Sequence, residues 1–112
     1  IKAIFRRAAP KPEEEVFTAG DVTLNVGKHL VLAKGREVIL TLKEFELLRL
    51  LMAHPGVAFR RDKLLEKVWG YGYAGKTNIV DVYIRYLRSK IDEKIGKKYI
   101  HTVRGIGYVA RD

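Results

Sequence analysis

Residues 77–95, TNIVDVYIRYLRSKIDEKI, decide the fold of this chain because they predict one long helix with two different sides. At about 100° per residue, four apolar side chains of this stretch fall in one narrow sector of the helix. They are Val80, Ile84, Leu87 and Ile91. A stripe of this kind packs against a hydrophobic core, so we expect one side of the helix to be buried.

The opposite side of this helix carries a second, mostly polar ridge. It consists of Asn78, Val82, Arg85 and Ser89, with Tyr86 flanking it. In the major groove of duplex DNA, Arg pairs with guanine, Asn pairs with adenine, and an apolar group meets the thymine methyl. The alternative is a solvated side on which Arg85 pairs with Asp81 one turn earlier, an interaction of roughly a few tenths of a kcal/mol. The helix alone leaves both interpretations open.

Positive charge is concentrated in the second half of the chain. Residues 57–112 hold thirteen Lys and Arg against six Asp and Glu, whereas residues 1–56 hold nine against seven, and the whole chain has a formal charge of +9. This asymmetry favours a polyanionic partner, most simply nucleic acid. An acidic protein, a membrane surface and a plain solvated face are the alternatives.

The 112 residues suffice for one domain with its own core, and none of them is Cys. This excludes disulfides, thiolate metal ligands and a Cys nucleophile. His29, His54 and His101 are scattered without metal-ligand spacing, so we expect no enzyme activity, no metal and no cofactor. No apolar run is long enough for a membrane span or a secretory signal, which favours a cytoplasmic protein without a membrane partner.

The organisation of the chain is predicted to change at residue 16. Residues 1–7 have apolar side chains at helical spacing but are too few for a stable helix, and residues 8–15, AAPKPEEE, have the composition of a linker. We therefore predict that residues 1–15 are the end of an upstream helix and its tether, and that residues 16–112 form the domain. A native N-terminus is the competing explanation.

Between residues 16 and 40, short apolar runs are separated by turn-forming residues. The runs are residues 16–17, 22–26, 30–33 and 38–40. This pattern predicts a four-stranded antiparallel meander. Residues 41–44, TLKE, then form a capping box that starts a largely apolar helix, which we expect to run to about His54 and to lie buried between two layers.

A shorter helix is predicted to end near Trp69, after a short strand at residues 57–59. Arg60, Arg61 and Lys63 lie at its start. A helix N-terminus already favours anions, so this cluster predicts a corner that binds phosphate. A solvated cluster of charges is the alternative.

Two further segments complete the predicted surface. Residues 70–76, GYGYAGK, form a loop whose aromatic residues, Tyr71 and Tyr73, are candidates for contact with a protein partner. Residues 99–111 are predicted to form a hairpin with Arg104 at its tip. A basic tip beside a major-groove helix can enter the adjacent minor groove.

Two sequences, NIVDVYIRYLRSKI and IHTVRGIGYVAR, together resemble the effector domain of the OmpR/PhoB family of bacterial response regulators. The resemblance extends over residues 17–111 and includes LTLKEFELLRLLMAHPG and DKLLEKVWG. The segment AAPKPEEE is also similar to the tether that follows the receiver domain in this family. The resemblance implies an α+β fold, namely a winged helix-turn-helix with an N-terminal four-stranded antiparallel sheet, three helices and a C-terminal β-hairpin wing.

The same resemblance implies a sequence-specific transcriptional regulator of a two-component phosphorelay. Phosphorylation of an upstream receiver domain would promote a homodimer on direct-repeat half-sites, and the loop before the long helix would contact RNA polymerase. The residues expected to contact DNA are Arg60, Arg61, Asn78, Val82, Arg85, Tyr86, Ser89, Thr102 and Arg104. Those expected in the polymerase loop are Tyr71, Tyr73 and Lys76.

The sequence departs from the family pattern at three of these positions. Arg60 stands where a Ser or Thr usually caps the second helix, which lowers the stability of that helix by on the order of 1 kcal/mol. Asn78 and Tyr86 stand where many relatives carry Arg, so the base preference of no single relative transfers to this chain. A protein-interaction module on a winged-helix scaffold is the alternative function, because a fold does not fix a function.

Overall fold

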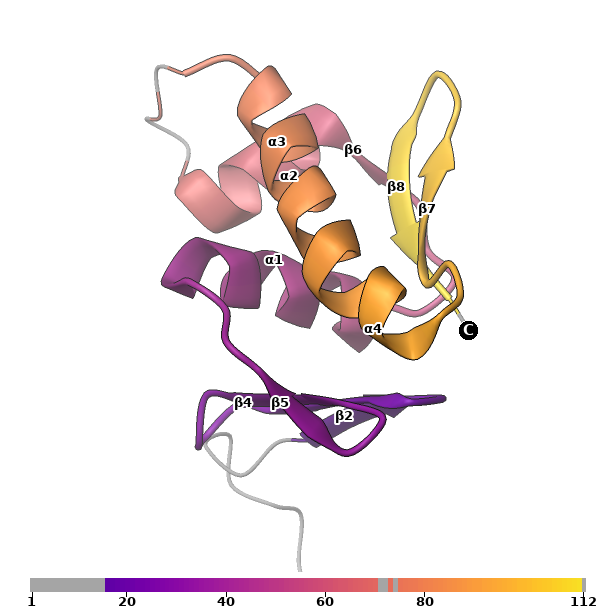
Figure 1. Cartoon of the computed structure of the whole chain (residues 1–112). Coiled ribbons are helices and arrows are strands. Elements are labelled where there is room, and N and C mark those ends of the chain that lie inside the picture. The colour runs from indigo at the N-terminus through magenta and orange to yellow at the C-terminus, as the bar shows by residue number, and fades with distance from the viewer. Residues whose placement is uncertain (1–15, 71–72, 74, 112) are drawn as a thin grey trace, which may run out of the picture.

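The first sheet of the computed structural model lies against one side of a helical layer, and a hairpin stands beside that layer (Figure 1). The structure describes residues 16–70, 73 and 75–111, so the predicted linker at residues 1–15 lies outside it. The first sheet has four antiparallel strands in sequence order: β2 (Val16–Ala19), β3 (Val22–Asn25), β4 (Leu30–Ala33) and β5 (Arg36–Val38). The predicted meander is confirmed.

The last strand of this sheet begins two residues earlier than the sequence pattern predicts. Ala33 pairs with Arg36, so the turn between β4 and β5 contains only two residues. Both have positive φ, 52° at Lys34 and 78° at Gly35, which is the geometry of a tight hairpin turn that matches the strand twist. Ile39, expected within the strand, follows it and is 74% exposed.

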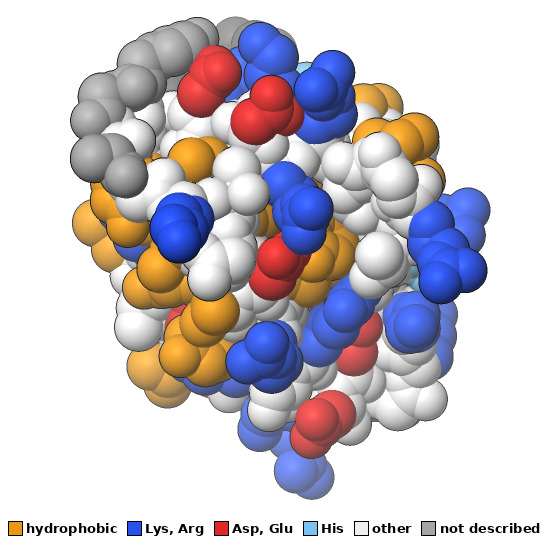
Figure 2. Space-filling model, turned by 90° about the horizontal axis from the view of Figure 1, so that it is seen from above, with side chains coloured by type: hydrophobic (Ala, Val, Ile, Leu, Met, Phe, Trp, Pro, Cys, Tyr) orange, Lys and Arg blue, Asp and Glu red, His pale blue; other side chains and the backbone are white. Residues whose placement is uncertain are grey.

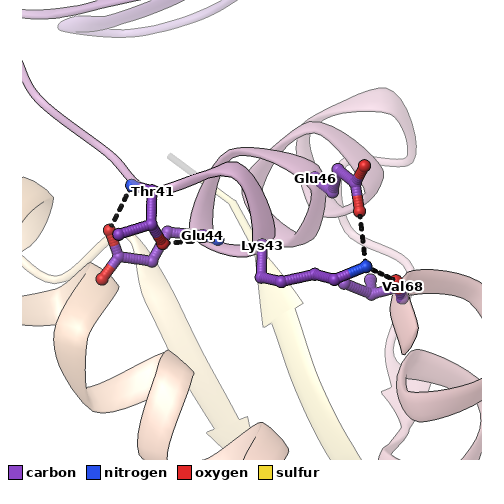
Figure 3. A network of polar contacts seen from close by, with 5 residues as sticks. All are labelled: Thr41, Lys43, Glu44, Glu46 and Val68. Atoms are coloured by element: carbon purple, nitrogen blue, oxygen red, sulfur yellow. Dashed lines mark hydrogen bonds and ion pairs between the residues drawn. The ribbon is translucent and has the colours of Figure 1, made fainter. Parts of the chain in front are cut away.

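Helix α1 (Leu42–Ala53) begins with the predicted capping box (Figure 3). The Thr41 N–H donates to Glu44 Oε1 at 2.8 Å, and the Glu44 N–H donates to Thr41 Oγ1 at 3.4 Å. In the first turn of α1, Lys43 Nζ donates to the carbonyl oxygen of Val68, in α2, at 2.9 Å. The box fixes where α1 starts, and Lys43 joins α1 to the end of the following helix.

The two remaining helices pack on α1. Helix α2 (Arg61–Trp69) is followed by α3 (Asn78–Leu87), and α3 continues through one π-helical turn, η2 (Arg88–Asp92), into α4 (Glu93–Ile95). The predicted long helix is therefore continuous but contains a change of pitch. The predicted core stripe is confirmed, since Val80, Ile84, Leu87 and Ile91 are each at most 1% exposed.

A second sheet carries the C-terminal hairpin. Its strand order is β6 (Phe59–Arg60), β8 (Gly107–Ala110) and β7 (Ile100–Val103), all antiparallel. The predicted strand at residues 57–59 is displaced towards the helix, because Phe59 and Arg60 are the residues that pair with β8. The hairpin forms the wing, and the fold is the predicted winged helix-turn-helix.

At Gly107, β8 approaches β6 too closely for a side chain. A Cβ at this position would overlap the backbone carbonyl oxygen of Phe59, which cannot turn away. Gly105, in the wing turn, is different: it has a φ of 77°, and a Cβ there would meet no atom within 4 Å. The two glycines are thus required for separate reasons.

We expect Gly107→Ala to lower the free energy of unfolding by about 3 kcal/mol, because the added methyl forces the two strands apart. Gly105→Ala serves as the control and should lose only about 1 kcal/mol, the conformational penalty of a left-handed alanine. Urea unfolding followed by circular dichroism measures both values. Equal losses for the two variants would contradict the close approach at Gly107.

Asp92, in the π turn, is a partly buried carboxylate. It accepts a hydrogen bond from the Ile100 N–H at 3.3 Å. Burial raises the pKa of the Asp92 carboxyl above its ordinary value, although this backbone bond and the charge of Arg88 act in the opposite direction. The folded state therefore binds the Asp92 proton more tightly than the unfolded chain does.

This proton affinity predicts the sign of a pH effect on stability. As pH rises from below the ordinary Asp pKa through the raised folded pKa, the wild type should lose stability relative to Asp92→Asn, which does not titrate. Above the folded pKa the difference should stay constant. Melting temperatures from pH 3 to pH 8, with Glu93→Gln as a control for net charge, measure the effect, and a difference that moves the other way would refute it.

Candidate nucleic-acid interface

The outward ridge of α3 is on the surface, as the helical phase requires. Asn78, Arg85, Tyr86 and Ser89 are exposed, and Val82 is partly buried. The alternative pairing of Arg85 with Asp81 does not occur, because the Asp81 carboxylate is held by other partners. Within the described part of the chain, no hydrogen bond or ion pair engages the Arg85 guanidinium, so its donors face solvent.

Tyr86 is held in place by a row of aromatic rings. Its ring meets Tyr83 edge-on at a centroid distance of 5.5 Å, and Tyr83 in turn meets Trp69 of α2 at 5.1 Å. Trp69 also lies 6.4 Å from Tyr73 in the loop between α2 and α3. The row links the ridge to that loop and limits the positions that Tyr86 can take.

The predicted basic corner exists at the start of α2, but each Arg there is paired with an acid. Arg60 occupies the N-cap position without a side-chain capping bond, and its Nε lies 3.4 Å from Asp62 Oδ1. Arg61 Nη1 lies 2.9 Å from Asp81 Oδ2 on α3. The Arg61 side chain remains 51% exposed, so part of its guanidinium is open to a ligand.

The wing is fixed to the end of α3 by Arg88, the first residue of η2, which no sequence motif singles out. Its Nε donates to the carbonyl oxygen of Ile100 at 3.2 Å, and its Nη2 donates to Thr102 Oγ1 at 2.6 Å. The guanidinium carbon also lies 5.6 Å from the ring centroid of Tyr108. In the sequence, Arg88 lies towards the edge of the outward ridge of the helix. This position is the only sequence signal for its contacts with the wing.

Tyr108, in β8, is a second contact between the wing and α3. It is 8% exposed, and its hydroxyl donates to Asp81 Oδ1. Burial and the Asp81 carboxylate raise the pKa of Tyr108 to about 12. The phenol therefore stays protonated and remains a hydrogen-bond donor at neutral pH.

A recess separates the basic corner from the wing tip. It has a volume of about 620 Å³ and is lined by Arg60, Arg61, Asp62, Thr77, Gly105 and Ile106. Arg104 is exposed in the turn directly beside it. Figure 2 shows this end of the molecule from above, where Lys and Arg side chains are spread over the surface with single Asp and Glu side chains between them.

The loop between α2 and α3 is described only in part. Tyr71 lies outside the described residues, whereas Tyr73 is 40% exposed and Lys76 is exposed. Across residues 16–70, 73 and 75–111 no group of three His, Asp or Glu side chains is placed to hold a metal ion. None of the helices in that part of the chain is long and apolar enough to cross a membrane.

A helix with an exposed, mostly polar ridge, a basic helix start and a basic hairpin lie together at this end of the molecule. This is the arrangement of a winged-helix DNA-binding domain. The chain belongs to the family described as "Transcriptional regulatory protein, C terminal", whose model matches residues 35–110. This is the OmpR/PhoB type of DNA-binding effector domain, a family of transcription regulators rather than of enzymes.

Similar proteins agree with this assignment. The chain is 44% identical to the transcriptional regulatory protein TrcR of Mycobacterium tuberculosis over 113 aligned residues, covering 99% of the chain but only 44% of TrcR. The DNA-binding domain of RstA from Klebsiella pneumoniae, solved in complex with the RstA box, superposes with a TM-score of 0.73 at 30% identity over 87% of the chain and 97% of that domain. DrrB, an OmpR/PhoB homologue of Thermotoga maritima, has a TM-score of 0.77 at 32% identity, with 87% of the chain and 44% of DrrB covered.

DNA binding by such a surface should weaken steeply with salt, because phosphate contacts release counterions. We expect Arg104→Ala to reduce the slope of log K against log salt by about one unit. Arg36→Ala, on the first sheet, removes the same charge far from the wing and should leave the slope unchanged. Fluorescence anisotropy with a random duplex at several salt concentrations measures the slopes, and an unchanged slope for Arg104→Ala would remove the wing tip from the interface.

Proposed function

We propose that this chain reads a specific sequence of double-stranded DNA as the effector domain of a two-component response regulator. The observation that carries the proposal is the exposed ridge of α3, in which the Arg85 guanidinium has no partner among the described residues. An Arg with all its donors directed to solvent loses no internal hydrogen bond when it meets a guanine. The basic corner and the wing flank this ridge, as a duplex requires.

The ridge supplies the base contacts in this proposal. Arg85 pairs with a guanine, Asn78 pairs with an adenine, and Val82 meets a thymine methyl group. Ser89 and Tyr86 lie at the borders of the ridge, where they contact bases or the adjoining phosphates. The fixed aromatic row behind Tyr86 supports a defined contact at that position, because little side-chain freedom is lost on binding.

The flanking elements supply the contacts that position the protein on the duplex. Arg60, Arg61 and Thr102 contact the phosphate backbone, and Arg104 enters the minor groove next to the wing. Phosphate contacts carry no sequence information themselves, but they fix the register of the reading helix. The α2 start, α3 and the wing then act on one stretch of DNA.

In this proposal the chain is the C-terminal part of a longer protein. The chain spans less than half of TrcR, which supports an upstream receiver domain whose phosphorylation leads to a homodimer on direct-repeat half-sites. Tyr71, Tyr73 and Lys76 contact RNA polymerase through the loop between α2 and α3. The protein acts in the bacterial cytoplasm, where the chromosome is accessible, and uses neither a cofactor nor an enzymatic reaction.

Selection of bound duplexes from a random pool tests the function and identifies the site. We expect Arg85→Ala to lose about 1–3 kcal/mol of discrimination at one base pair, because one bidentate guanine contact is removed. Binding to random DNA should change much less. Arg36→Ala, which removes the same charge from the first sheet, is the control and should select the wild-type sequence. If Arg85→Ala also selects the wild-type sequence, Arg85 does not read a base. If the wild type enriches no sequence, a protein-interaction role on the same scaffold replaces the proposal.

A further inference from the structure

Asp81 is a carboxylate within the surface that faces DNA, where its charge repels phosphates. It lies in the first turn of α3, and its side chain is 28% exposed. Both of its oxygens are engaged: Oδ2 lies 2.9 Å from Arg61 Nη1, and Oδ1 accepts the hydroxyl of Tyr108. Removing this charge would strengthen attraction to any DNA. The carboxylate therefore does not serve to increase the affinity for DNA, and another role must explain it.

The two partners of Asp81 belong to the two elements on either side of α3. Arg61 is the first residue of α2, and Tyr108 lies in β8 of the wing. Arg88 adds a second link on the same helix, because it lies over the Tyr108 ring and donates to Thr102 in β7. Asp81 is therefore one side chain of this helix that contacts both flanking elements, α2 through Arg61 and the wing through Tyr108.

The geometry leaves Arg61 able to bind a phosphate while Asp81 holds it. A guanidinium has five N–H donors, and the ion pair uses Nη1. The exposed half of the Arg61 side chain faces the recess beside the wing. Tyr108, by contrast, is 8% exposed, so we assign its bond to Asp81 to the placement of β8.

We propose that Asp81 is a positioning residue for sequence discrimination: it fixes Arg61 and the wing relative to α3, so that the phosphate contacts form only when the ridge is in register with its bases. The inference rests on the proposed function and deepens it. With Asp81 in place, both flanking elements are held at set distances from the ridge. Without it, Arg61 and the wing can reach phosphates on any duplex, whether or not the bases match.

This role separates two quantities that a merely structural residue would change together. Asp81→Asn removes the negative charge, so the ion pair with Arg61 is lost, and it replaces one of the two acceptor oxygens by an amide donor. Affinity for random duplex should rise, because a repulsive charge is gone and Arg61 is released. Affinity for the selected duplex should not rise with it, and the ratio of the two affinities should fall roughly tenfold, the value of one hydrogen bond to a charged group.

Asp62→Asn is the matched control. It makes the same change of charge in the first turn of α2, and the Asp62 carboxylate is ion-paired with Arg60 of the same turn rather than with the wing. This variant should raise the affinity for both duplexes alike and leave their ratio unchanged. A pure charge effect at Asp81 would give the same result as the control.

Tyr108→Phe isolates the wing connection without any change of charge. It should lower the affinity ratio, because the wing is released from α3 while the charge of the surface is unchanged. It also keeps the test decisive if Asp81→Asn does not fold, which thermal unfolding of each variant shows. Asp81→Glu, which retains the charge and both acceptor oxygens, should recover part of the ratio.

The measurement is the dissociation constant of residues 1–112 for the duplex recovered by selection and for a scrambled duplex of the same length, by fluorescence anisotropy at fixed salt. A ratio that falls for Asp81→Asn and Tyr108→Phe but not for Asp62→Asn supports the inference. An unchanged ratio in a folded Asp81→Asn, or in Tyr108→Phe where Asp81→Asn does not fold, overturns it. If the wild type itself binds both duplexes equally, the proposed function fails, and the inference that rests on it fails with it.

Discussion

Glu44 joins the start of α1 to η2, the segment that continues α3. It is 3% exposed, and its Oε1 accepts both the Thr41 N–H at 2.8 Å and Lys90 Nζ at 2.7 Å. One carboxylate thereby caps α1 and holds the helical segment that follows α3. Leaving such a buried charge without its partners would be strongly unfavourable, so the start of α1 and the segment η2 are constrained together. Because η2 continues α3, this constraint also limits how the helix that carries the outward ridge can lie on the domain.

The sequence predicts what depends on local spacing. The core stripe through Ile84, the capping box at Thr41 and the basic tip at Arg104 each follow from a repeat, a cap or a turn signal within a few residues. Strand ends are less well determined: β5 and β6 are displaced because cross-strand pairing, not composition, decides where a ladder begins. Asn78, Arg85, Tyr86 and Ser89 could be placed on the surface from helical phase alone.

Pairings between distant residues could not be predicted in this way. Asp81 has a possible partner in Arg85 one turn away, yet it pairs with Arg61, twenty positions earlier in the chain. Lys90 and Glu44 are separated by 46 positions. Such contacts depend on how whole elements pack, and one sequence carries no record of that packing. For the same reason the contacts of Arg88 with Ile100 and Thr102 could not be predicted, because they form only once the hairpin has folded against the helix.

The π turn at residues 88–92 changes the pitch of the helix that begins with α3. The Glu93 N–H donates to the carbonyl oxygen of Arg88, five residues back, so this turn contains more residues than an α-helical one. If one residue were lost here, regular α-helical pitch could return, but every later side chain would rotate by about 100°. Ile91 would then leave the interior, and Lys90 would no longer face Glu44. The angle between the residues before and after this turn therefore depends on a single residue of length.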